Sequence, residues 1–199
     1  MCNVVSVTAK PLCKDDFLQR IRKISDSEVQ YIILREKYLS EQEYYSLAKE
    51  VLSVCDKEKL IIHNFIGTAE SLGIKKIHLP FSAFKELNSR RNFDIVGTSV
   101  HSVDDAAFAQ ENGAVYITAG NIYETDCKKG LKGKGVNFLR NVCESVDIPV
   151  YAIGGINADT AGGFNAVTEK NFAGVCVMSL LMQCENIDNE VLKLQSKLR

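Results

Sequence analysis

Short apolar runs that alternate with amphipathic stretches are the feature that most constrains the fold of this sequence. The runs are rich in β-branched residues and lack a polar side chain at every second position, which is typical of strands covered on both faces. The stretches between them have the apolar spacing of helices. We therefore expect parallel βα units, with strands at residues 3–8, 31–34, 60–62, 76–79, 95–100, 115–118, 149–153 and 175–178.

Several expected helices carry signals for their ends. Asp15 or Asp16 can cap the first helix. Ser40 with Glu43 has the spacing of a capping box for the second. Ser102 can cap a helix at residues 103–111. Further helices are expected at residues 68–72, 137–146, 159–168 and 187–198.

About eight βα units in 199 residues fit a compact single (β/α)8 TIM barrel, close to the lower size limit of that fold. No linker or low-complexity segment interrupts the pattern, so we expect one domain over residues 1–199. A doubly wound open sheet is the alternative, because periodicity alone does not exclude it. No GxGxxG motif follows the first strand, however.

The composition is that of a soluble globular protein, with 46% hydrophobic and 25% charged residues. A formal net charge of −1 does not indicate a nucleic-acid or membrane surface. No apolar run is long enough to span a bilayer, and the first residues lack the pattern of a signal peptide. The seven cysteines form no CxxC pair and favour a reducing cytoplasm over a disulfide framework or a zinc site.

The stretch from residue 115 to 136, VYITAGNIYETDCKKGLKGKGV, combines a predicted strand with a glycine- and lysine-rich loop. Glycines let backbone N–H groups approach an anion, and lysines add positive charge. The loop carries Thr125, Cys127 and Lys128, which we take as candidate ligand contacts. The stretch therefore indicates a phosphate-carrying ligand, although a solvated lysine loop would have the same composition.

Other candidates follow the remaining strands, because the active site of a barrel lies at the carboxyl ends of its strands. Barrels often bind phosphate with the loops after strands seven and eight. Here these loops carry Gly154-Gly155 and Ser179, and the combination favours a phosphate site over an ordinary tight turn. The strand-end candidates elsewhere are Arg35, Glu36, Lys37, His63, Asn64 and His101.

Each candidate has a structural interpretation as well. Arg35 and Lys37 suit an anionic substrate group, but they would also fit a surface salt-bridge cluster with Glu36 and Glu41. A lone histidine is more often a hydrogen-bonded structural residue than a base, and we expect this of His78 above all. Cys127 in its basic loop has no obvious base beside it, so we expect a ligand contact rather than a nucleophile.

At this point the sequence resembles the superfamily of thiamine phosphate synthases and thiazole tautomerases, over residues 31–179. The specific piece is the run ETDCKKGL at residues 124–131, with Gly133 and Gly135, which looks like the tautomerase (TenI) branch. The other matching pieces are LREK at 34–37, IHL at 77–79, GTSVHS at 97–102 and AIGGI at 152–156.

The synthases of this superfamily use Mg²⁺ on aspartates to neutralise a leaving diphosphate. The resemblance places those aspartates after strands three and four, where this sequence has His63-Asn64 and residues 81–83, FSA. Ile33 stands where a glutamine is usual. Both metal carboxylates are missing, so we expect a poor synthase without a metal site.

The tautomerase reaction needs a phosphate anchor and an acid/base group but no metal. The resemblance maps the anchor onto Gly154, Gly155, Val177, Met178 and Ser179. Its histidine base corresponds to Asn121, which can form hydrogen bonds but cannot shuttle a proton near neutral pH. We expect His63 to take over as the base, with His101 as the second candidate.

Three hypotheses follow. The first is a cytoplasmic, metal-independent thiazole tautomerase. The second is a divergent thiamine phosphate synthase that retains Arg35, Lys37 and Lys128 and requires Mg²⁺. The third is a non-catalytic protein that binds thiazole phosphate or thiamine phosphate, which Asn121 favours. All three imply a small phosphorylated ligand, and the sequence leaves open whether the chain forms a homo-oligomer.

Overall fold

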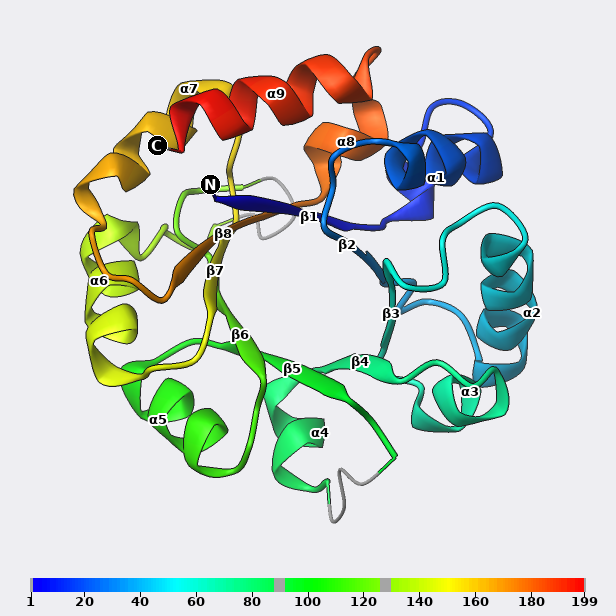
Figure 1. The fold of residues 1–199 in the computed structure, drawn as a ribbon, viewed down its shortest axis with the longest axis horizontal. Coiled ribbons are helices and arrows are strands. Elements are labelled where there is room, and N and C mark those ends of the chain that lie inside the picture. The colour runs from blue at the N-terminus through cyan, green and yellow to red at the C-terminus, as the bar shows by residue number, and fades with distance from the viewer. Residues whose placement is uncertain (1, 88–91, 126–129, 199) are drawn as a thin grey trace.

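The computed structural model describes residues 2–87, 92–125 and 130–198 and contains a closed barrel of parallel strands (Figure 1). The order of the strands around the barrel follows the sequence, and the last strand pairs with the first. This closure confirms the expected (β/α)8 barrel and excludes the open sheet. The strands are β1 (Asn3–Val7), β2 (Tyr31–Leu34), β3 (Leu60–His63), β4 (Lys76–Leu79), β5 (Ile95–Val100), β6 (Tyr116–Gly120), β7 (Val150–Ile153) and β8 (Phe172–Val177).

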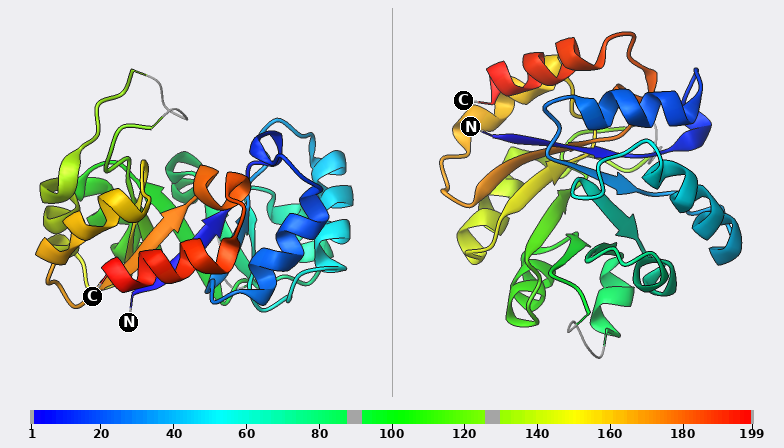
Figure 2. Two further views of the ribbon diagram at one scale, coloured as in Figure 1. Left: turned by 90° about the horizontal axis from the view of Figure 1, so that it is seen from above. Right: turned by 45° about the vertical axis from the view of Figure 1, so that its right-hand side comes forward.

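Helices surround the barrel and cover the outer face of its strands (Figures 1 and 2). They are α1 (Phe17–Asp26), α2 (Glu41–Leu52), α3 (Ile66–Ser71), α4 (Phe81–Lys85), α5 (Val103–Glu111), α6 (Gly135–Ser145), α7 (Ala158–Ala161), α8 (Ser179–Gln183) and α9 (Ile187–Lys197), with 3-10 turns at Lys10–Leu12 and Gly162–Ala166. Among the described residues, none of these helices has both the length and the apolar character needed to cross a bilayer.

The expected helix caps are present. Asp16 caps α1 by accepting a hydrogen bond from the backbone N–H of Gln19. Ser40 and Glu43 form the reciprocal capping box of α2. Ser102 caps α5 through the backbone N–H of Asp105. These contacts satisfy backbone donors that the first turn of a helix leaves without partners.

Two apolar layers bury the strands on both faces, as the continuous hydrophobic runs predict. The inner layer fills the barrel and includes Val5, Ile33, Ile61 and Cys176. The outer layer lies between strands and helices and includes fully buried side chains such as Ile32, Leu60, Ile62 and Ile77. Alternation along each strand therefore decides which side chains point into the barrel.

Some boundaries differ from the expectation. β6 continues through Gly120, because its backbone pairs with Ile153 of β7. β8 begins at Phe172 rather than at residue 175, since Gly174 extends the strand instead of ending it. The short helices α4 and α8 were not predicted, because neither has a side-chain cap that marks its start. The helix expected at 159–168 is the short α7 followed by a 3-10 turn.

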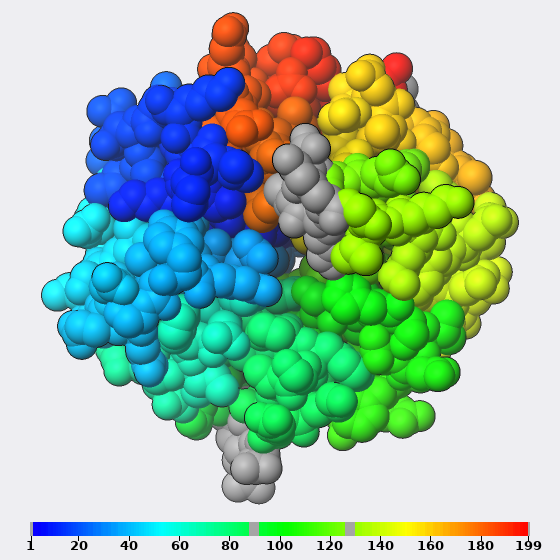
Figure 3. Space-filling model, turned by 180° about the vertical axis from the view of Figure 1, so that it is seen from behind, coloured from blue at the N-terminus to red at the C-terminus, as the bar shows by residue number. Residues whose placement is uncertain are grey.

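The carboxyl ends of the strands meet on the face opposite to the viewer in Figure 1. Figure 3 shows this face, which has a hollow near its middle. The loops that follow the strands surround the hollow, so the polar strand-end residues of the sequence gather there.

Candidate active site

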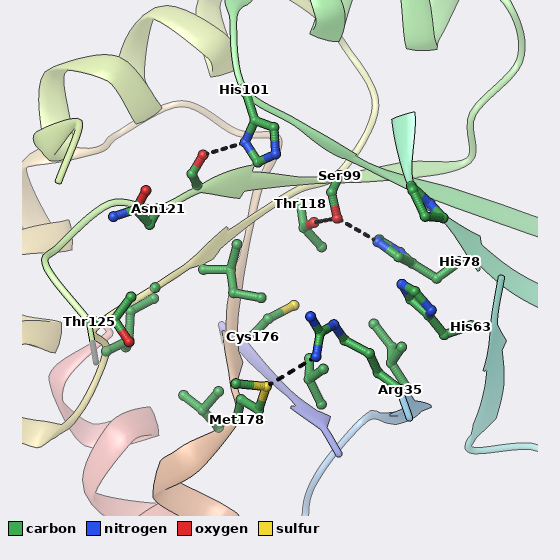
Figure 4. Close-up of a pocket in the computed structure, with 18 of the residues that line it drawn as sticks. Arg35, His63, His78, Ser99, His101, Thr118, Asn121, Thr125, Cys176 and Met178 are labelled. Carbon is green, nitrogen blue, oxygen red and sulfur yellow. Dashed lines mark hydrogen bonds between the residues drawn. The ribbon is translucent and has the colours of Figure 1, made fainter. Parts of the chain in front are cut away.

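A cavity of ≈ 410 Å³ lies at the carboxyl ends of the strands (Figure 4). Each strand of the barrel contributes to its lining, either through its last residues or through the loop that follows. Apolar side chains such as Val7, Ile33 and Ile153 form part of its wall, and polar groups converge on it from several strands. A concave, partly apolar site with a few convergent polar groups is the usual form of a small-molecule site.

The residues expected to bind phosphate lie together at this cavity. Ile153 of β7 pairs with Cys176 of β8, which places the segments after the two strands side by side. The first segment is Gly154-Gly155, and the second leads to Ser179, where α8 begins. All of the expected anchor residues line the cavity, namely Gly154, Gly155, Val177, Met178 and Ser179.

The two glycines are required by close backbone contacts. Gly154 has φ +107° and Gly155 has φ +65°, values that favour glycine. A Cβ atom on Gly154 would lie 2.5 Å from the Cβ of Asn121, and one on Gly155 would lie 2.7 Å from the Cβ of Tyr123. The loops after β6 and β7 can therefore touch only because neither glycine has a side chain.

Positive charge lines the cavity on the side of β2. Arg35 is half-buried, and its guanidinium points toward the sulfur of Met178 at 4.0 Å. Lys37 also lines the cavity. Glu36 is not part of the surface salt-bridge cluster that we considered, because it is 1% exposed and accepts hydrogen bonds from Thr8 Oγ1 and the backbone N–H of Lys10. Burial raises the pKa of the Glu36 carboxyl.

His63 and His78 face the cavity as neutral imidazoles. Burial, with the nearby His78, Arg35 and Lys37, lowers the pKa of His63 to about 2. Burial, with the same two cations, lowers the pKa of His78 to about 3. The two rings stack with centroids 5.9 Å apart. A group with so low a pKa is a weak proton acceptor near neutral pH, which weighs against the expected role of His63 as the base.

His101 has the geometry of an acid/base group. It is exposed, lines the cavity, and its Nδ1 lies 2.8 Å from the backbone oxygen of Gly120. A carbonyl only accepts, so Nδ1 donates its proton to Gly120, and Nε2 is the nitrogen left to contact a ligand. Asn121 is buried, lines the cavity, and donates from Nδ2 to the backbone oxygen of Tyr123 at 3.2 Å.

The loop after β6 is described only in part. Thr125 lines the cavity, and its expected ligand contact stays a prediction. Cys127 and Lys128 lie outside the described residues, so their expected ligand contacts stay predictions.

Ser99 and Thr118 also line the cavity and were not singled out from the sequence. Their hydroxyl oxygens lie 3.0 Å apart, and Ser99 Oγ lies 2.8 Å from His78 Nε2. Strand alternation was the available signal, because Ser99 shares the inner face of β5 with residue 97, and Thr118 shares that of β6 with Tyr116 and Gly120. A serine or threonine inside a strand does not by itself indicate a functional residue.

The residues around the cavity do not suit a hard divalent cation. Magnesium prefers carboxylate and carbonyl oxygens, and no Asp or Glu is among the described residues that line the cavity. Glu36 is close in sequence, but hydrogen bonds to Thr8 and Lys10 occupy both of its carboxylate oxygens. The described part of the chain also holds no cluster of three potential metal ligands. Two cations beside the cavity favour an anion instead.

Comparison with known proteins shows the family to which this chain belongs. The family model described as "Thiamine monophosphate synthase" matches residues 4–181. A putative thiamine-phosphate synthase 2 of Aquifex aeolicus is 36% identical over 156 residues, covering 76% of this chain and 83% of that protein. A thiamine-phosphate synthase of Clostridium acetobutylicum is 30% identical over 190 residues, covering 92% and 89%. These names do not support the closeness to the tautomerase branch that we expected.

A solved structure agrees with the sequence relatives. The thiamine phosphate pyrophosphorylase of Pyrococcus furiosus superposes with a TM-score of 0.80 and 25% identity, covering 98% of this chain and 95% of that one. The family model, the sequence relatives and this solved structure agree, so the chain belongs to the thiamine monophosphate synthase family.

Proposed function

We propose that this chain joins a pyrimidine diphosphate to a thiazole phosphate, the reaction of thiamine phosphate synthases. The observation that supports the proposal is a cavity that has groups suited to bind anions on two of its sides. Arg35 and Lys37 belong to β2 and its loop, and Figure 4 shows Arg35 across the cavity from Asn121, whose loop contacts Gly154. Two phosphorylated substrates would use both sides, and the names of the relatives support the same reaction.

In this reaction the thiazole nitrogen forms a bond to the methylene carbon of the pyrimidine. The bond from that carbon to the diphosphate oxygen breaks, and the diphosphate leaves with the electron pair. Arg35 and Lys37 would stabilise the negative charge that develops on the leaving group. Gly154, Gly155 and Ser179 would hold the phosphate of the thiazole.

A second candidate is the thiazole tautomerase reaction, in which a proton moves on a single phosphorylated ring. The observation that favours it is His101, which lines the cavity and whose Nδ1–H is held by the Gly120 carbonyl, so that Nε2 is left to contact a ligand. An acid/base reaction needs such a group and no metal. Under this reaction we assign the base to His101 by its geometry, because burial and nearby positive charge lower the pKa of His63 to about 2.

One set of assays with the purified protein tests the proposal. A mixture of the pyrimidine diphosphate and the thiazole phosphate should yield thiamine phosphate and diphosphate. We expect formation to persist with EDTA, because no carboxylate is among the described residues that line the cavity. Arg35→Ala should reduce the rate by about 100-fold, the size typical of a lost charged group at a developing anion.

Two results would contradict the proposal. Proton exchange on the thiazole carboxylate phosphate without condensation would support the tautomerase, and His101→Ala should then abolish exchange while His63→Ala should not. A ligand-induced rise in melting temperature without either reaction would support a binding protein.

A further inference from the structure

A buried carboxylate separates the two cations of the cavity along the chain. Arg35 and Lys37 line the cavity, and Figure 4 shows the guanidinium of Arg35 pointing into the open space. Glu36 lies between them in the sequence, is 1% exposed and is not among the described residues of the lining. A buried carboxylate is costly unless hydrogen bonds satisfy it, so the partners of Glu36 show what it holds.

Hydrogen bonds connect this carboxylate to the segment that follows β1. Thr8 is fully buried and donates from Oγ1 to Glu36 Oε1 at 2.6 Å. The backbone N–H of Lys10 lies 3.0 Å from both oxygens of the carboxylate. Burial raises the pKa of Glu36, and these donors oppose that shift because they favour the charged form. The carboxylate therefore joins the segment after β2 to the segment after β1.

The same threonine holds the backbone of Arg35. The pairing of β1 with β2 ends at Val7 and Ile33, and the N–H of Thr8 still donates to the Ile33 oxygen at 2.9 Å. The N–H of Arg35 then donates to the hydroxyl of Thr8 at 2.9 Å. An amide N–H only donates and a carboxylate only accepts, so the hydroxyl accepts from Arg35 and donates to Glu36.

We propose that Glu36 and Thr8 are positioning residues, which hold the backbone between the two cations so that Arg35 and Lys37 reach the diphosphate of a pyrimidine substrate. Arginine and lysine lose conformational freedom when they bind an anion, and a fixed backbone lowers that cost. Charges that need no rearrangement also stabilise a leaving diphosphate best. This inference rests on the proposed function and specifies how its cations are held in place.

Two substitutions at Thr8 test the hydroxyl with little change of shape. Thr8→Val replaces the hydroxyl by a methyl group, so the N–H of Arg35 and the carboxylate of Glu36 each lose one partner. In isothermal titration, this variant should bind the pyrimidine diphosphate about tenfold more weakly, the size expected for a lost charge-assisted hydrogen bond. Thr8→Ser keeps the hydroxyl and should recover most of that affinity.

The thiazole phosphate distinguishes positioning from a general loss of structure. Its proposed anchor follows β7 and β8, whereas the two cations follow β2. Thr8→Val should therefore raise KM for the pyrimidine diphosphate and leave KM and affinity for the thiazole phosphate unchanged. An equal loss for both ligands would show that Thr8 only supports the fold, and would overturn its positioning role.

Glu36→Gln tests the carboxylate by the sign of its effect. On charge alone, removal of a carboxylate beside two cations should strengthen the binding of an anion. Positioning predicts the opposite, because the NH₂ group of the amide cannot accept from Thr8 or Lys10, and affinity for the pyrimidine diphosphate should fall by about tenfold. Glu41→Gln is the matched control, since it removes an exposed carboxylate at the start of α2 and should change this affinity by less than about twofold.

The outcomes separate the inference from the proposed function. Unchanged affinity for the pyrimidine diphosphate in Thr8→Val, or tighter binding in Glu36→Gln, would overturn the inference alone. A loss in Thr8→Ser as large as that in Thr8→Val would show that the hydroxyl is not what holds the segment, with the same consequence. Failure of the unmodified protein to bind the pyrimidine diphosphate would overturn the proposed function, and the positioning role with it.

Discussion

His63 and His78 make the stability of the fold depend on pH. Their pKa values are about 2 and about 3 in the folded chain, against an ordinary value of 6.5. Between these values the unfolded chain binds more protons than the folded chain, so acidification favours unfolding. Above about pH 6.5 these histidines therefore do not lower the free energy of unfolding, and below that pH the free energy of unfolding falls as the pH decreases. At pH 5 each histidine should cost about 2 kcal/mol of unfolding free energy.

Urea denaturation at pH 7 and pH 5 measures this effect. We expect His63→Gln to remove about half of the pH dependence, because a glutamine does not titrate. His101→Gln is the control, because it removes an exposed imidazole and leaves both buried ones in place. Equal unfolding free energies at the two pH values in the unmodified protein would show that the buried imidazoles take up protons without cost.

Residue roles at the site could be predicted only in part. Arg35 and Gly154 directly follow β2 and β7, and Ser179 comes two residues after β8, so the rule that barrel sites lie at strand ends correctly placed all three at the cavity. The low pKa of His63 could not be predicted, because it depends on burial and on neighbours from other strands. Ser99 was missed for the same reason, since its importance comes from contacts with His78 and Thr118.

The loops after β6 and β7 form one unit through Gly155. The backbone at this position has a positive φ, and an added Cβ atom would overlap the backbone of Glu124 and the Cβ of Tyr123. Gly155→Ala should therefore separate the loops, weaken phosphate binding by tenfold or more and lower the unfolding free energy by about 1–3 kcal/mol. Isothermal titration with the thiazole phosphate and urea denaturation measure the two effects.

Gly162→Ala is the matched control for this substitution. A Cβ atom at Gly162 meets no atom within 4 Å, and the backbone there has an ordinary helical φ of −59°. We expect unchanged ligand binding and an unfolding free energy within about 0.5 kcal/mol of the unmodified protein. If the two alanine variants behave alike, the loops do not depend on the missing side chain at Gly155.

Strands and long helices could be predicted because their signals are local. Apolar runs marked the strands, and the side chains of Asp16, Ser40 and Ser102 marked helix starts that the structure confirms. The short helices α4 and α8 could not be predicted in this way. Neither is capped by a side chain, and α8 begins where β8 ends, so tertiary contacts rather than local sequence decide its start.

The arrangement of the barrel followed from repetition rather than from any one element. Eight strands separated by helices can close only if the last strand reaches the first, and the sequence carries no direct sign of that contact. The structure shows it as a pairing of β1 with β8, in which Asn3 lies opposite Gly174. The apolar run predicted this strand only from residue 175, which left Gly174 outside it.

Gly174 is the residue on which closure of the barrel depends most directly. Its φ is +146°, and a Cβ atom there would overlap the backbone of Asn3, with the nitrogen only 2.6 Å away. Backbone atoms of a paired strand cannot move aside as a flexible side chain can. Gly174→Ala should therefore open the seam between β1 and β8 and lower the unfolding free energy by about 3 kcal/mol, measured by urea denaturation.

The neighbouring Ala173→Ser is the control for this substitution, because it changes a side chain on the same strand and leaves the backbone of the seam alone. Hydrogen exchange locates the damage. Faster exchange in Gly174→Ala should begin at the amides of β1 and β8 and be smaller at β4 and β5, on the far side of the barrel. Uniformly faster exchange in all strands would mean that the barrel opens only by global unfolding, and unchanged stability would mean that the two end strands do not need this close approach.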